Sequence, residues 1–202
     1  MTVMVNSLYL IYAAIAYALG MVSLAYLFGF LIDFGVPKGI NDGEYHSLWR
    51  SILWDCSLVF CFGLHHSVTA RSSFKRWWTQ WVPPAIERSS YVLMTALLTF
   101  LVVYFWKPIP IKIWSVDSQF WSGAILTAYA ATWMMMVAST FHFGHFGFMG
   151  LRQAWERYLN RPAHPVPFTA RYLYALVRHP ISLGWMLMPW LTPKMTVGQL
   201  VW

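Results

Sequence analysis

An uncharged run near the start of the chain, Leu8–Ile32, limits the folds that this protein can adopt. The first charged residue is Asp33. A helix of about 20 apolar residues crosses a hydrocarbon core of ~30 Å, so this run is long enough to span a bilayer. It lacks the basic start and the small-residue cleavage site of a signal peptide. We therefore interpret it as a permanent span, and the protein as an integral membrane protein.

The composition agrees with a membrane location. Only 10% of the 202 residues are charged and 58% are hydrophobic, whereas a soluble domain has about 25% charged residues. Three further apolar segments predict spans, and they run from about Leu48 to His66, from Tyr91 to Trp106, and from about Trp121 to Ser139.

The last part of the chain has a different pattern. The apolar segment Ile181–Pro193 is too short to span, Thr192–Thr196 predicts a turn, and a new apolar run starts at Val197. This pattern predicts the first arm of a helical hairpin whose second arm is cut short at Trp202. The fold class that we expect is all-α: a polytopic transmembrane helix bundle with about five membrane helices, forming one domain over residues 1–202.

The net charge of +7 comes from basic residues in short loops between apolar runs. This placement indicates orientation against a lipid bilayer, and it argues against nucleic acid as a partner. The two loops richest in Lys and Arg follow the second and the fourth span, so the positive-inside rule places both loops and the N-terminus in the cytoplasm. We expect a multi-pass protein of a bacterial inner membrane.

Asp55 and His66 are the first candidates for chemistry. An acid at bilayer depth needs a partner, so Asp55 is either a site residue or a structural hydrogen-bond anchor. His66 shares a helical face with Asp55, but eleven residues separate the two by about 16 Å along a helix. His66 is either a direct participant or a polar helix end. Cys56 and Cys61 lie on different faces of this segment, which argues against a disulfide.

His142 and His145 stand at i, i+3, a spacing that places both on one face of a helix and that can serve a metal. A membrane di-iron site needs several such boxes, and this chain has few acids and seven histidines in all. A Phe/His-rich turn at the membrane interface explains the pair better. We therefore predict no metal site.

The segment "YALVRHPISLG" crowds Arg178, His179 and Pro180 against an apolar run. A helix start explains the proline, since a missing N–H is harmless in the first turn. It does not explain the neighbouring cation and imidazole.

This segment, from Tyr174 to Gly184, resembles the cofactor motif of the isoprenylcysteine carboxyl methyltransferase superfamily of membrane enzymes. Ser182 replaces the second tyrosine of that motif. The stretches "HSVTARSSFKRWW" (66–78), "ERSSYVL" (87–93), "GLRQAW" (150–155) and "TPKMTVGQL" (192–200) are similar to the branch that methylates methanethiol.

The resemblance implies S-adenosyl-L-methionine as cofactor and a pocket that faces the cytoplasm. It implies cofactor contacts for the following residues: Gln153, His164, Phe168, Thr169, Tyr174, Arg178, His179 and Pro180. Relatives also close the pocket with a glutamate pair beyond the second hairpin arm, and we expect that pair to follow residue 202 in a longer chain.

The function implied is methylation of a small thiol, methanethiol to dimethyl sulfide. A thiol must lose its proton before it attacks, and His66 and His142 are the candidate bases, with Asp55 as relay or orienting partner. Three alternatives stay open: a related methyltransferase acting on a prenylated carboxylate or another small thiol, a non-enzymatic membrane protein of the same fold, and a metal enzyme.

Overall fold

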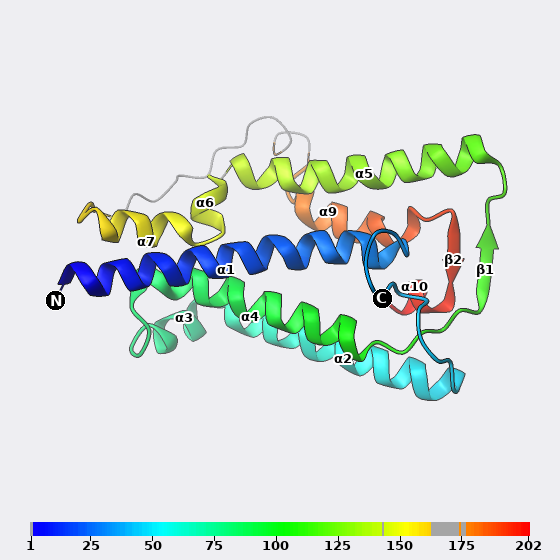
Figure 1. Ribbon diagram of the computed structural model, residues 1–202, viewed down its shortest axis with the longest axis horizontal. Helices are drawn as coiled ribbons and strands as arrows, with labels where there is room; N and C mark the ends of the chain where they lie inside the picture. Colours follow the sequence, from blue (N-terminus) through cyan, green and yellow to red (C-terminus); the bar gives the residue numbers. More distant parts are fainter. Residues whose placement is uncertain (1, 143, 163–173, 175–176) are drawn as a thin grey trace. The chain divides into compact units, whose positions relative to one another are not determined.

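The structure is a computed structural model, and it describes residues 2–142, 144–162, 174 and 177–202. Helices dominate it, which confirms the predicted all-α class (Figure 1). The four long helices are α1 (Thr2–Leu31), α2 (Leu48–Ala70), α4 (Pro84–Phe105) and α5 (Gln119–His142).

Three of these helices, α1, α4 and α5, are long and apolar enough to cross a membrane. Helix α2 has 23 residues, a sufficient length. It does not meet the same test of length and composition, and its sequence includes Arg50, Asp55 and two histidines. Helix α4 starts earlier than the sequence pattern predicted, because Pro84 can occupy the first helical turn, where a missing N–H is harmless.

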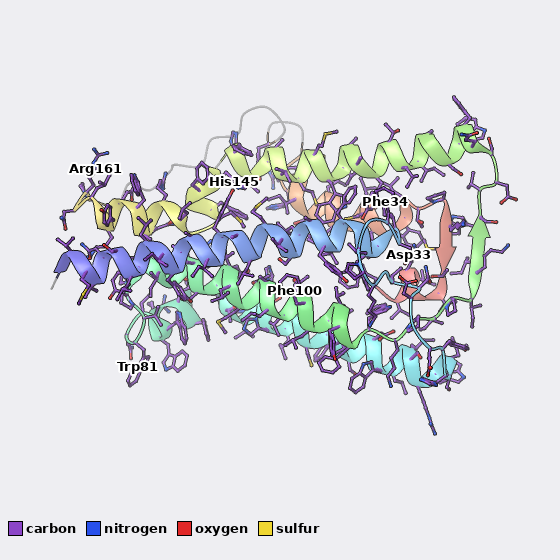
Figure 2. The ribbon with its side chains drawn as sticks, viewed as in Figure 1. Asp33, Phe34, Trp81, Phe100, His145 and Arg161 are labelled. Carbon is purple, nitrogen blue, oxygen red and sulfur yellow. The ribbon has the colours of Figure 1, made fainter. Side chains whose placement is uncertain are left out.

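Shorter elements connect the long helices. They are α3 (Ser72–Trp78), β1 (Lys112–Ser115), α6 (His145–Phe148), α7 (Leu151–Tyr158), α9 (Pro180–Leu187), the 3₁₀ turn η1 (Met188–Trp190), β2 (Lys194–Thr196) and α10 (Val197–Val201). Helix α3 buries no residue, and Trp81 after it points away from the helices (Figure 2). Exposed tryptophans beside basic residues are typical of the membrane–water interface.

The turn predicted over Thr192–Thr196 is wrong in its second half. Residues Lys194–Thr196 form strand β2, which pairs antiparallel with β1. Pro108 and Pro110 each lack an N–H and cannot continue helix α4, so the chain after them is extended and available for pairing. Thr196 then caps α10 in a capping box with Gln199.

The described residues divide into two compact units, and each unit combines separate segments of the chain. The first unit takes its residues from 1–25, 60–101 and 143–167, and the second from 26–59, 102–142 and 168–202. Helices α1, α2 and α4 each contribute to both. The expectation of one domain over residues 1–202 stays a prediction.

In the first unit, polar pairs connect α1 and α4 to the segments that pack against them. The Tyr12 hydroxyl donates to Oγ of Ser90 at 2.9 Å, and the Asn6 amide donates to the carbonyl of Arg157 at 3.1 Å. Ser89 Oγ donates to the carbonyl of Gly150 at 2.9 Å. Each pair satisfies a polar group that would otherwise be buried without a partner.

In the second unit, aromatic rings and a glycine contact form the core. Trp106 lies 6.0 Å from Phe30 and 5.6 Å from Trp202, measured between ring centroids. Helices α5 and α9 lie side by side (Figure 1). Gly184 of α9 allows this approach, because a Cβ atom there would collide with the side chain of Met136.

Gly150, between α6 and α7, should be intolerant of any side chain. Its φ is +90°, and a Cβ atom would lie 2.5 Å from the backbone nitrogen of Ser89. We expect Gly150→Ala to lower the free energy of unfolding by about 3 kcal/mol, through backbone strain and overpacking. Thermal unfolding of the purified protein measures this change. Gly123→Ala in α5, where a Cβ meets nothing within 4 Å, is the matched control, and an equal loss in both variants would contradict the argument.

Candidate functional site

The predicted site residues fall in both units, so the polar clusters of each unit are described by themselves. His66, in the last turns of α2, belongs to the first unit. Its Nε2 and Nδ1 lie 2.9 and 3.0 Å from the hydroxyl of Tyr91 on α4, and the ring of Phe62 stacks on the imidazole at 5.8 Å between centroids. The structure therefore gives His66 a partner that can orient its ring.

Arg88 lies on the other side of the same tyrosine. Its guanidinium carbon is 4.9 Å from the ring centroid of Tyr91 and 4.9 Å from that of Phe148. Its Nε donates to the carbonyl of Phe148 at 2.6 Å. Aromatic faces attract a cation through their quadrupole, so the two rings hold this positive charge in place.

Gln153, predicted to contact the cofactor, is on α7. Its Nε2 donates to the carbonyl of Gly147 at 2.9 Å, which fixes the orientation of the amide. Its Oε1 is buried and accepts no hydrogen bond from any described residue. A buried acceptor without a partner is costly, so this oxygen suits a ligand that brings an N–H or O–H donor.

His142 and His145 do not lie on one face of a single helix, which agrees with the turn that the sequence favoured and not with the alternative of an i, i+3 pair. Helix α5 ends at His142, and α6 begins at His145 after Gly144, whose φ is +75°. Glycine adopts this left-handed conformation readily, so it breaks the helical spacing between the two histidines. Among the described residues, no group of three or more His, Cys, Asp or Glu could hold a metal ion.

His145 is a buried residue that the sequence pattern did not select as a site residue. Its side chain is 6% exposed, and Figure 2 labels it on α6, beside α1. Its Nε2 lies 3.0 Å from the hydroxyl of Tyr17. Burial lowers the pKa of His145 below its usual value, because desolvation disfavours the charged imidazolium.

In the second unit, His142 contacts Tyr174, the first residue of the predicted cofactor motif. The two rings stack with centroids 4.9 Å apart and planes 27° apart. Tyr174 is 8% exposed, and burial raises the pKa of its hydroxyl. The structure thus brings together a candidate base and a candidate cofactor contact.

The next three motif residues start α9. Pro180 occupies the first helical position as the sequence predicted, and His179 is the N-cap residue. The side chains of Arg178 and His179 are exposed, which leaves both available to a ligand. The predicted contacts His164, Phe168 and Thr169 lie outside the described residues.

Asp55 is completely buried in the second unit. Its Oδ1 accepts the backbone N–H of Lys107 at 3.0 Å, while Oδ2 has no hydrogen-bond partner among the described residues. Nearby, Lys38 Nζ donates to the carbonyls of Tyr104 and Trp106 at 2.8 and 2.9 Å. These contacts satisfy backbone groups at the end of α4, and they support the structural alternative for Asp55. A role in catalysis stays a prediction.

Cys56 and Cys61 are both free, as the sequence predicted.

No family model matches the chain, and no solved structure matches it. Individual proteins of known name are, however, similar to this chain. A methanethiol S-methyltransferase of Crocosphaera subtropica is 37% identical over 192 residues, which cover 95% of this chain and 75% of that protein. One from Mycobacterium tuberculosis is 36% identical over 192 residues, covering 95% of this chain and 79% of that protein.

The chain belongs to the methanethiol S-methyltransferase family. Nurim of Xenopus laevis is a further relative, 31% identical over 183 residues that cover 81% of this chain and 64% of that protein. The similarity to this family covers 95% of the chain. The resemblance that the motifs suggested is thereby confirmed.

His145 should make the stability of the protein depend on pH. Since burial lowers its pKa in the folded state, the unfolded chain binds a proton more readily. The stabilisation is therefore complete above a pH of about 6.5, the usual pKa of histidine, and is lost as the pH falls. We expect the melting temperature of the wild type to fall more steeply between about pH 8 and pH 5 than that of His145→Gln. Parallel curves would refute this assignment, and Tyr17→Phe, which retains the buried imidazole, should keep the steep curve.

Asp55 should contribute to stability through its bond to the Lys107 N–H. Asp55→Ala leaves that N–H without its acceptor, and we expect a loss of about 1–3 kcal/mol in the free energy of unfolding. Asp55→Asn keeps an acceptor oxygen and should lose less. Equal stability of wild type and Asp55→Ala would show that the contact is not an anchor, and full methyl transfer by Asp55→Asn would argue against a proton-relay role.

Proposed function

We propose that this protein methylates methanethiol to dimethyl sulfide, with S-adenosyl-L-methionine as the methyl donor, at the cytoplasmic face of a bacterial inner membrane. The observation that carries the proposal is the similarity to methanethiol S-methyltransferases over 95% of the chain. The side chains of both units supply the kinds of groups that such a reaction needs.

The described motif residues are compatible with the cofactor. The unpartnered Oε1 of Gln153 can accept a hydrogen bond from an ammonium or a ribose hydroxyl. Exposed Arg178 can pair with a carboxylate, and Tyr174 offers an aromatic face for a sulfonium. When bound, the cofactor supplies an electrophilic methyl group for in-line displacement by sulfur.

The thiol that accepts the methyl group must also be deprotonated, and a side chain of the protein is needed for this step. A thiol is a poor nucleophile until it is deprotonated, and a positioned imidazole can take that proton. His66 and His142 are the candidates, and each contacts an aromatic residue that can orient it: Tyr91 for His66 and Tyr174 for His142. The apolar helices support a membrane location, from which a small apolar thiol can enter by way of the lipid.

The orientation that we propose for the protein across the membrane is based on the basic residues in its loops. The connection between α2 and α4 contains Arg71, Lys75 and Arg76 and no acid, which supports a cytoplasmic position. His66, at the α2 end of this connection, would then lie on the cytoplasmic side. With α2 as the second crossing, as the sequence pattern predicted, the N-terminus would lie on the same side.

Product analysis tests the proposed function. The purified protein, incubated with S-adenosyl-L-methionine and methanethiol, should form dimethyl sulfide and S-adenosylhomocysteine in equal amounts. Methylation of other thiols or of a prenylated carboxylate, with none of methanethiol, would favour the alternative acceptors. Absence of product together with absence of cofactor binding would favour a non-enzymatic protein of this fold.

Removal of the base should lower the turnover number about 10²–10⁴-fold. We expect this loss in His66→Ala or in His142→Ala, measured at saturating cofactor and thiol. His46→Ala is the matched control, because that side chain is 66% exposed. If His66→Ala and His142→Ala both retained full methyl transfer, neither histidine would be the base.

A further inference from the structure

The guanidinium of Arg88 lies between two aromatic rings, but most of its N–H groups donate no hydrogen bond to a described residue. A guanidinium has five N–H donors, and only Nε is used, in the bond to the Phe148 carbonyl. Its two terminal nitrogens make no hydrogen bond or ion pair with any described residue. The donors that remain can bind an anion.

The nearest acid in the sequence is already engaged. Glu87 lies 4.0 Å from Nζ of Lys75, measured from Oε1. Between Asp55 and Glu87 the chain contains no other acid, and none of the ion pairs among the described residues includes Arg88. Glu87 attracts Arg88 electrostatically but forms no ion pair with it, so the charge of this half-buried guanidinium is only partly compensated. An anionic ligand at this position would therefore be favourable.

A candidate proton acceptor lies beside this cation. The Tyr91 ring contacts the guanidinium on its face, and the Tyr91 hydroxyl lies 2.9 Å from Nε2 of His66. Phe62 covers the imidazole and Phe148 covers the guanidinium. A fixed cation and an oriented imidazole thus border one tyrosine in a largely apolar setting.

We propose that Arg88 binds the sulfur anion of the thiol substrate, while His66 takes the thiol proton. This inference rests on the proposed thiol methyltransferase function. In the step, the S–H bond breaks, the proton moves to a ring nitrogen of His66, and the electron pair stays on sulfur opposite the guanidinium. The cation is needed because an alkyl thiol, like cysteine with a pKa of about 8.5, is mostly protonated at neutral pH, and a neighbouring cation favours the thiolate.

Another anion could use the same donors, namely the carboxylate of the cofactor. Arg178, which is exposed at the motif, is already assigned to that carboxylate in the proposed function. The aromatic walls around Arg88 suit a small apolar thiolate better than a zwitterionic amino acid, which needs donors and acceptors together. The experiment separates the two ligands.

The test compares Arg88→Gln, Arg88→Lys and Arg157→Gln in the complete chain. Arg157 belongs to the same unit and its side chain is exposed, which makes it the matched control. For Arg88→Gln we expect the KM for methanethiol to rise roughly tenfold or more at pH 7, and the pH at which the rate rises to move upward. Arg88→Lys keeps the charge and should recover part of the loss. Affinity for S-adenosylhomocysteine, measured by titration calorimetry, should be unchanged in all three variants.

The measurements distinguish an error in the role of Arg88 from an error in the proposed function. A wild-type KM and pH profile in Arg88→Gln would refute the inference, and weaker binding of S-adenosylhomocysteine with unchanged thiol kinetics would assign Arg88 to the cofactor. If the wild type formed no dimethyl sulfide, the proposed function would fail, and thiocyanate, a small sulfur anion, would then probe the site directly. Thiocyanate should raise the melting temperature of the wild type and of Arg157→Gln but not of Arg88→Gln, and an equal rise in all three would refute anion binding at Arg88.

Discussion

Polar groups buried among apolar helices must bond to one another, because neither lipid nor a packed core offers them water. Both units are organised by this constraint. In the first, Tyr12 and Tyr17 of α1 bond to Ser90 and His145. In the second, Asp55 accepts the Lys107 N–H. Such bonds fix how each helix is rotated about its axis, and they therefore decide which side chains face the interior of a unit.

The charged residues of the chain serve two different purposes. Arg71 and Arg76 are exposed beside the tryptophans of α3, where cations and indole rings favour the membrane interface. Arg88 is held between two aromatic rings. A cation in that setting is less hydrated than one at the surface, so its attraction for an anion is stronger. This difference is the physical basis for assigning chemistry to Arg88 of α4 and membrane orientation to the arginines of the connection that precedes α4.

Much of this protein could be predicted from its sequence, because the relevant signals are local. The long apolar runs predicted the four long helices, and Pro180 predicted the start of α9. The motif around Tyr174 predicted the family, which the relatives confirm. The sequence pattern predicted a turn where the structure has strand β2, because strand pairing depends on distant residues. Lys194–Thr196 form a strand only because β1, far away in the sequence, supplies the partner.

The sequence by itself determined the helical membrane class, the family and the residue types available for methyl transfer, since hydropathy, proline positions and motifs are properties of short segments. Only the tertiary structure decided which of these side chains meet. It separated His142 and His145 through the left-handed Gly144, stacked His142 on Tyr174, and placed Arg88 with His66 around Tyr91. Contacts of this kind depend on how helices from distant parts of the chain pack together, and helical periodicity within one segment does not contain that information.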